Sequence, residues 1–295
     1  MADPRGDSGK GGPAVAVIVL AQNEAQRIDR CLEAILGQSH PPGLVVVVDH
    51  ASSDGTAERV RARRDPRLRL VSADARDGIA AARNSGVAGA AAEIVFFTDA
   101  DCAPHRHWLA EGLAALRDPS LAGVEGVTYY EAPTPTTIRD SGTHQFAPGG
   151  YMTCNIAYRR ETLDAAGGFD PRFRFGHEDR ELAFRVLRSG AIGFCPSMVV
   201  AHQRKRHDAR GLWRLARRAG DLVLFFKLHG VQPPCRGRVL YPGRLLTLFF
   251  PPLILLKESI RSWRDLGFAA AFYLYVIAER LVIWKAALRR RIFVI

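Results

Sequence analysis

The sequence predicts an α/β protein with an open, mostly parallel sheet flanked by helices, followed by a basic and apolar helical appendage. Over the first hundred or so residues, apolar runs rich in β-branched residues alternate with segments of helical periodicity, which predicts the sheet and its helices. The charge distribution predicts the appendage. Residues 1–200 hold 22 Lys and Arg against 25 Asp and Glu, a net charge of −3, whereas residues 201–295 hold 19 against 5, a net charge of +14.

The chain has 295 residues, 47% of them hydrophobic, which is enough for one large domain with an appendage. Its five cysteines are widely spread and contain no CxxC pair. This argues against a disulfide framework and a zinc cluster, and suits a reducing cytosol. Residues 1–13 are polar and rich in glycine and proline, so we expect a disordered lead and not a signal peptide.

The elements of the first half follow in order. The unbroken apolar runs at 14–21 and 44–50 are typical of parallel strands that are buried on both faces. Between them, apolar residues recur at helical spacing. The expected elements are strands at 14–21, 44–50, 68–73 and 93–101, and helices at 28–36, 78–91 and 108–116.

After residue 119 this alternation breaks down. We expect a strand at 124–130 and, at 131–152, a long polar loop with several prolines that is a candidate cover for a site. An amphipathic helix is expected at 178–190, with Leu182, Val186 and Leu187 facing inward.

Polar residues follow three of the predicted strands, at 21–24, 49–54 and 99–101. In an open parallel sheet, ligands bind beyond the carboxyl ends of the strands. The three clusters should therefore meet at one edge of the sheet and form a site.

The stretch FFTDADCAP at 96–104 ends a strand with two aspartates one residue apart. Side chains two apart on a strand share a face, so Asp99 and Asp101 should point the same way. Such close carboxylates repel each other unless positive charge or water separates them. Their oxygens suit Mg²⁺ or Mn²⁺, with a nucleotide diphosphate supplying further oxygens. The alternative is a solvated turn with two surface acids.

Seven motifs, in order and at similar spacing, resemble the family-2 glycosyltransferases, which have the GT-A fold. They are VIVLAQNEAQRI, VVVVDHASSDGT, GIAAARNSG, FFTDADC, NIAYRRETLDAAGGFD, GHEDREL and VVAH. The resemblance covers about residues 14–205. It implies a nucleotide-sugar half at 14–119 and an acceptor half at 120–205, and leaves 206–295 as a helical, membrane-associated region.

The resemblance also implies a donor site. Asp49 would accept the N–H of a uracil ring, although His50 stands where the family often has an acid or Asn, and helix capping is the alternative role for Asp49. Arg83 would face the donor pocket, unless it merely lies on a helix surface. The full set of implied donor contacts is Ala21, Gln22, Glu24, Asp49, Gly78, Arg83 and Asp99.

A metal site follows from the same resemblance. Asp101 would bind Mn²⁺ or Mg²⁺ directly, with Asp99 nearer the ribose or a metal-bound water. His202 follows an apolar run and would complete the metal shell, as a histidine does in many GT-A enzymes. A purely structural histidine is the alternative.

Glu178 and Asp179 begin a predicted helix, where the helix dipole favours the ionised carboxylate that a general base needs. Adjacent helical residues point about 100° apart, so only one should face the reacting centre. The resemblance assigns the base to Asp179 and leaves Glu178 to orient the acceptor. Asn155 is a further implied acceptor contact. First-turn acids that only complement the dipole are the alternative.

The predicted function is inverting, metal-dependent transfer of a sugar from a nucleotide diphosphate, with UDP expected, to a hydroxyl of a lipid-linked or cell-envelope acceptor. A sugar nucleotidyltransferase would need a Gly-rich basic loop after the first strand, and LAQNEAQRI offers none. A non-catalytic protein that binds membranes or nucleic acid is the other alternative, although it would not need the acids. We expect no nucleic-acid partner.

The last third combines its positive charge with apolar stretches at 245–256 and 266–278. Basic and apolar residues together are typical of contact with an anionic membrane. Lys257 and the Glu279-Arg280 pair interrupt both stretches before the roughly 18 residues of a spanning helix. We therefore expect peripheral or monotopic attachment at the cytoplasmic face of the membrane. The alternative is ordinary core helices with a basic face.

Overall fold

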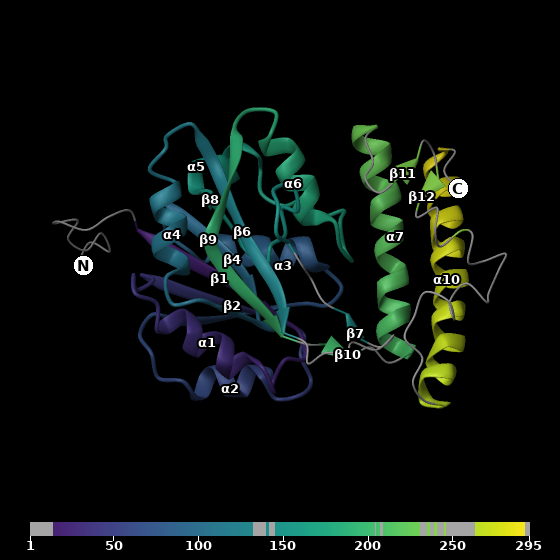
Figure 1. Cartoon of the computed structure of the whole chain (residues 1–295), viewed down its shortest axis with the longest axis horizontal. Helices are drawn as coiled ribbons and strands as arrows, with labels where there is room; N and C mark the ends of the chain where they lie inside the picture. Colours follow the sequence, from purple (N-terminus) through teal and green to yellow (C-terminus); the bar gives the residue numbers. More distant parts are fainter. Residues whose placement is uncertain are drawn as a thin grey trace.

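The computed structural model describes most of the chain as an α/β body beside a pair of long helices (Figure 1). The expected lead at 1–13, the stretch at 245–256 apart from Leu245, and residues 132–139 and 142–144 of the expected loop lie outside the described residues. The described ranges are 14–131, 140–141, 145–203, 205–206, 209–230, 235–236, 239–240, 245 and 263–292.

One eight-stranded sheet forms the centre of the body, in the order β3-β2-β1-β4-β8-β6-β9-β5. Neighbours are parallel from β3 to β4 and between β6 and β9, whereas β8 is antiparallel to both of its neighbours, and β5 to β9. The strands are β1 (Val15–Ala21), β2 (Leu44–His50), β3 (Leu68–Ala73), β4 (Ile94–Asp99), β5 (Cys102–Pro104), β6 (Leu121–Glu131), β8 (Ile156–Arg159) and β9 (Ala191–Gln203).

Helices cover both faces of the sheet. On one face α1 and α4 pack in a core with Phe96 and Val124, and on the other α3, α5 and α6 pack in a core with Phe97 and Tyr158. The helices are α1 (Ile28–Leu36), α2 (Thr56–Ala62), α3 (Ile79–Ala88), α4 (Trp108–Ala115), α5 (Arg160–Ala165), α6 (Glu178–Val186), α7 (Ala209–His229) and α10 (Trp263–Arg290). The strand pairs β7 (Asp140–Ser141) with β10 (Lys205–Arg206), and β11 (Cys235–Arg236) with β12 (Val239–Leu240), lie apart from the main sheet.

Helix α3 lies very close to the sheet because it carries few large side chains. A Cβ atom at Gly86 would lie 2.6 Å from Cγ2 of Ile18 and 2.8 Å from Cγ2 of Val48, closer than real carbon atoms approach. The glycine therefore lets α3 rest directly on β1 and β2. The same helix carries Arg83, so this close packing helps to place that side chain.

The predicted fold class is confirmed, and the predicted strands and helices of the first half are all present. Two details differ. Strand β4 ends at Asp99, so Asp101 lies in the turn before β5 and the pleat of a strand does not orient it. Helix α6 ends at Val186, so Leu187 caps the helix and is 42% exposed, contrary to the prediction that it faces inward.

The second half holds elements that the sequence pattern does not reveal. Strand β8 is only four residues long, and β9 contains Pro196 and several exposed residues. Strand β8 lies between β4 and β6, so the two halves of the body share one continuous sheet.

Helix α7 lies between the α/β body and α10 (Figure 1). Its residues Leu224 and Phe225 pack into the core of the body, and its opposite side packs against α10 through Ala216 and Val223. Within the described part of the chain, no helix is both long enough and apolar enough to cross a membrane.

Candidate active site

The carboxyl ends of β1, β2 and β4 meet at one edge of the sheet, as the sequence predicts. The Gln22 side chain donates a hydrogen bond to the backbone oxygen of His50, 3.0 Å away, and the Ala100 amide donates to the oxygen of Leu20. Asp49 is 7% exposed, and its Oδ1 atom has no hydrogen-bond partner. A buried polar atom without a partner is costly, so this carboxylate is suited to accept a hydrogen bond from a ligand.

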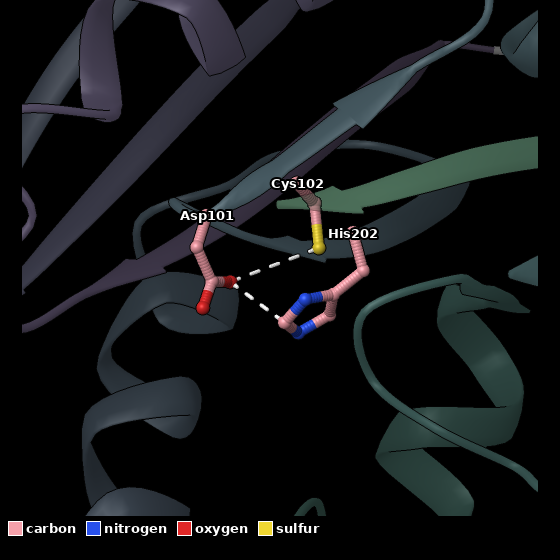
Figure 2. A group of neighbouring side chains, drawn as sticks. All are labelled: Asp101, Cys102 and His202. Carbon is pink, nitrogen blue, oxygen red and sulfur yellow. Dashed lines mark hydrogen bonds and ion pairs between the residues drawn. The ribbon is translucent and has the colours of Figure 1, made fainter. Parts of the chain in front are cut away.

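Asp101 and His202 come together from distant parts of the chain (Figure 2). The antiparallel pairing of β5 with β9 sets Cys102 opposite His202, and the Nε2 atom of His202 lies 3.7 Å from Oδ1 of Asp101. The other ring nitrogen, Nδ1, lies 3.0 Å from the backbone oxygen of Gln203, which fixes the ring orientation. The side chains of Asp101 and His202 thus lie close together, as the sequence predicts, and could bind the same ion.

Sequence reasoning missed Cys102, although it directly follows Asp101. Its Sγ atom lies 3.8 Å from Oδ1 of Asp101, and the potential ligand atoms of Asp101, Cys102 and His202 all lie within 4.8 Å of one another (Figure 2). Burial raises the pKa of the Cys102 thiol well above its usual range, which favours the protonated form. A thiol suits Mn²⁺ or Mg²⁺ less well than a carboxylate does, so Cys102 would lie beside such an ion and would not bind it.

Arg83 joins the donor and acceptor sides of the site. It is 3% exposed, which excludes the alternative of a surface arginine. Its Nη2 atom donates to Oδ1 of Asp99 at 3.2 Å, and its Nε atom donates to Oε1 of Glu178 at 3.3 Å. One guanidinium therefore holds a carboxylate at the end of β4 and another at the start of α6.

Glu178 and Asp179 differ in accessibility. Glu178 is 2% exposed and its Oε2 atom has no hydrogen-bond partner, whereas Asp179 is half-buried. Burial, followed by the charge of Asp179, raises the pKa of Glu178 to about 7, although Arg83 opposes the shift. Burial thus favours the protonated form of Glu178, contrary to the sequence argument for an ionised carboxylate. Asp179 is therefore the more exposed carboxylate of the pair.

The structure does not support an acceptor contact for Asn155, which is fully buried. Its amide nitrogen donates to the backbone oxygens of Val127 and Met198, and its side-chain oxygen accepts a hydrogen bond from the indole of Trp108. No polar group of this side chain is left for a ligand. We correct the assignment: Asn155 joins β6, β9 and α4.

Three further predicted donor contacts, Ala21, Glu24 and Gly78, have surroundings that the structure describes. The Ala21 side chain is fully buried in β1, so only its backbone can face a ligand. Glu24 pairs with Arg27 at 3.0 Å. Gly78 has φ +86°, and a Cβ there would lie 2.7 Å from Cα of Arg174, so this glycine allows the chain before α3 to contact the segment before α6.

The C-terminal end of the expected loop is fixed by Glu125, a fully buried residue of β6. Its carboxylate accepts hydrogen bonds from the Gln145 side chain and from the amides of Gly149 and Tyr151. Sequence reasoning did not single out this residue. Residues 145–151 are therefore held against the sheet on the acceptor side.

A surface hollow of about 770 Å³ lies at the other end of β4, beside Ile94 and Arg159. The Arg159 guanidinium donates to the backbone oxygens of Leu121 and Leu116, so it serves the fold. None of the predicted site residues lines this hollow.

Comparisons with known proteins bear on the family of this chain. Residues 16–181 match the family model described as Glycosyl transferase family 2. Glycosyltransferase AglE of Haloferax volcanii is 32% identical over 170 residues, which are 53% of this chain and 56% of the relative. Pre-mycofactocin glycosyltransferase of Mycobacterium tuberculosis is 28% identical over 227 residues, 70% of this chain and 46% of the relative. The chain spans about half the length of these curated relatives.

Solved structures share this fold. Mannosyltransferase PcManGT from Pyrobaculum calidifontis, in complex with GDP-Man and Mn²⁺, superposes with a TM-score of 0.60 at 26% identity, covering 92% of this chain and 87% of that one. S. aureus TarS in complex with UDP superposes with a TM-score of 0.53 at 16% identity, covering 95% and 92% of the two chains, which shows the fold alone.

Proposed function

The chain belongs to glycosyltransferase family 2, and from this premise we propose that it transfers a sugar from a nucleotide diphosphate to an acceptor hydroxyl with inversion at the anomeric carbon. One observation carries the proposal. Asp101 and His202 lie 3.7 Å apart at the sheet edge where β2 presents the unpartnered Oδ1 of Asp49. A site for a divalent ion and a site for a nucleoside base thus share one edge.

The residues have separate roles in the proposed reaction. Asp49 would bind the nucleoside base of the donor, and Asp101 with His202 would hold Mn²⁺ or Mg²⁺. When bound, the ion would offset negative charge on the departing diphosphate. PcManGT, at 26% identity, is in complex with both GDP-Man and Mn²⁺, which supports a divalent ion here.

We propose Asp179 as the general base that removes the acceptor proton. Asp179 is accessible, whereas Glu178 is buried and bound to Arg83. Glu178 then orients the acceptor side of the site and Arg83. Attack of the acceptor and departure of the diphosphate on opposite faces of the sugar give inversion.

UDP is the expected donor nucleotide, and GDP is the second candidate. A carboxylate at Asp49 can accept the single imide N–H of uracil. It can equally accept the adjacent ring N–H and amino group of guanine with its two oxygens. The GDP-Man bound by PcManGT favours testing guanine in parallel.

The test is calorimetric titration of UDP and GDP into the full chain with Mn²⁺, and again with EDTA. We expect one nucleotide to bind at least tenfold more tightly, only when the metal is present, and Asp49→Asn to reduce that preference. Equally tight nucleotide binding with Mn²⁺ and with EDTA would contradict the proposed metal site at Asp101 and His202. A matching screen of nucleotide sugars identifies the sugar.

We also propose that the chain acts at the cytoplasmic face of a membrane on a lipid-linked or cell-envelope acceptor. Cys31, Cys102, Cys154 and Cys195 are free thiols, which suits the cytosol. The face of α10 opposite α7 supports membrane contact. It exposes Leu274, Leu281 and Leu288 at seven-residue intervals, together with Trp284 and the half-buried Ile277.

Charge favours an anionic membrane as the partner of this α10 face. Among the side chains described on α10, those of residues 270–290, the exposed charged ones are the basic Lys285 and Arg289. Glu279 is buried. Basic residues beside an apolar stripe match anionic headgroups above acyl chains.

Vesicle sedimentation tests this face. The full chain should sediment with phosphatidylserine-containing vesicles and remain bound at high salt, and the double change Leu281→Glu with Leu288→Glu should release it. Leu187→Glu, at an exposed leucine of the body, is the matched control. Full-length protein that stays in the supernatant at low salt would contradict the proposal. A dimer that the same double change dissociates would assign the face to a second copy.

A further inference from the structure

Residues 174–177 lead directly into Glu178 and Asp179, and their backbone is unusual. Gly176 has φ 158°, and His177, which precedes the first residue of α6, has φ 66°. A left-handed conformation is uncommon for a residue with a side chain, and it persists only where surrounding contacts hold it. The direction in which α6 presents its first acids depends on this segment.

A carboxylate of α7 holds the segment. Oδ2 of Asp221 accepts hydrogen bonds from the amides of Phe175, at 2.6 Å, and Gly176, at 3.2 Å. Asp221 is 5% exposed, and within the described helix 209–229 it is the only acidic residue. Burial raises the pKa of Asp221 to about 6, while these amides and the charge of Arg290 from α10 oppose that shift.

Two arginines of α7 complete the contact. The Arg217 guanidinium lies over the Phe175 ring, 3.9 Å from its centroid. Arg218 packs so closely on Gly176 that a Cβ atom there would lie 2.5 Å from its Nε atom. Arg217, Arg218 and Asp221, which lie on two successive turns of α7, thus hold the segment from one side.

The far end of α7 also contacts α6. The Nε2 atom of His229 lies 3.2 Å from Oε1 of Glu181, and the rings of Phe184 and Phe225 pack edge to face at 5.6 Å. Helix α7 therefore contacts α6 itself as well as the segment that precedes it. A helix that served only to attach the body to another surface would not need these polar contacts with the segment before the proposed base.

We propose that Asp221 is a positioning residue for the transfer reaction: it fixes residues 174–177 and thereby the direction of Asp179. The inference rests on the proposed function, because it takes Asp179 as the base. It goes beyond that function by making α7, which lies outside the matched residues 16–181, part of the reaction machinery. Asp221 does not touch the reacting atoms.

Hydrogen exchange and kinetics on the full chain test the proposal together. Asp221→Ala should increase amide exchange in residues 174–178 about tenfold and leave exchange in α4 unchanged. With an identified donor, it should lower kcat about tenfold or more, with donor KM and nucleotide Kd within about twofold of the wild type. Asp221→Asn keeps one acceptor oxygen and should recover part of kcat. Arg214→Ala, at an exposed position of α7, is the control and should change nothing.

Each outcome decides a different statement. Unchanged exchange at 174–178 in Asp221→Ala, or in Asp221→Leu if the alanine variant does not fold, would overturn the proposal, because neither side chain can accept a hydrogen bond. Faster exchange in Asp221→Ala with an unchanged kcat would also overturn it. So would a loss of nucleotide affinity in that variant as large as its loss of kcat. A wild-type chain that binds nucleotide but transfers no sugar would overturn the proposed function, while the exchange result would still decide whether Asp221 holds the segment.

Discussion

The site contains two groups of side chains that place different partners next to their carboxylates. We call them the Arg83 corner (Arg83, Asp99 and Glu178) and the Asp101 corner (Asp101, Cys102 and His202). At the Arg83 corner, a buried guanidinium contacts Asp99 and Glu178, so the chain itself supplies permanent positive charge. At the Asp101 corner, the neighbours of the carboxylate are an imidazole and a thiol, groups that coordinate metals. The first corner can hold its shape without a ligand, whereas the second is suited to a cation that arrives with the nucleotide.

The largest expected effect is at the Asp101 corner. Asp101→Asn removes the charged oxygen that would hold the ion, so we expect no detectable turnover and no EDTA-sensitive nucleotide binding. Calorimetry with Mn²⁺ measures this, and circular dichroism checks the fold. Cys102→Ser is the matched control and should keep metal-dependent binding, because we do not assign the thiol as a ligand. A serine variant as defective as Asp101→Asn would make Cys102 a third ligand.

The next effect concerns the base beside the Arg83 corner. Asp179→Asn should retain nucleotide binding and lose about 10² to 10⁴ in kcat, the usual range for removal of a general base. Glu178→Gln should be milder, because Glu178 is buried and paired with Arg83. Steady-state rates of both variants decide the assignment, and the reverse ranking would move the base by one residue.

Substitutions of Arg83 test whether its side chain holds Asp99 and Glu178 together in the absence of a ligand. Arg83→Met leaves two carboxylates without their shared partner, and breaking a buried pair in this way costs about 3–5 kcal/mol of unfolding free energy. Urea unfolding measures it in the absence of nucleotide. Arg83→Lys keeps the charge but cannot fork between two carboxylates, so its loss should be smaller. No loss in either variant would remove the contrast between the corners.

The smallest expected effect is a pH dependence of stability at Asp221. Its folded pKa of about 6 is raised from an ordinary value of 3.8, so the folded state binds a proton more tightly than the unfolded state. The protonated group carries no penalty below about pH 4, and the wild type loses stability as pH rises from about 4 to 6. Relative to Asp221→Asn, the unfolding free energy should fall by at most about 3 kcal/mol. Urea unfolding of both proteins at pH 4.5 and pH 7 measures this. The same difference in unfolding free energy between the wild type and Asp221→Asn at both pH values would contradict it.

The sequence predicts those parts of the fold whose pattern is strong. The buried strands β1, β2 and β4 are continuous apolar runs, and α1 repeats its apolar residues every three or four positions. Strand β8 is too short, and β9 too exposed, for periodicity to reveal them. Their places in the sheet depend on pairing between residues far apart in the chain.

The site shows the same limit. Asp49, Asp101 and His202 are predictable because each comes shortly after an apolar run in the sequence. The structural role of Asn155 is not, since its three bonds join elements that only the folded chain brings together. Asp221 gave one local signal, a lone acid in a basic and apolar segment, and its partners at 175 and 176 could not be read from that signal.

The pairing of β5 with β9 also has a consequence for synthesis on the ribosome. Among the described strands, β9 is the only neighbour of β5, so Asp101 cannot meet His202 until the chain has been made through residue 203. At about 5–20 residues per second, that is about 5–20 seconds after Asp101 itself is added. During this interval β1, β2, β3 and β4 can pair with one another, so the nascent chain can form the proposed nucleoside site before the proposed metal site.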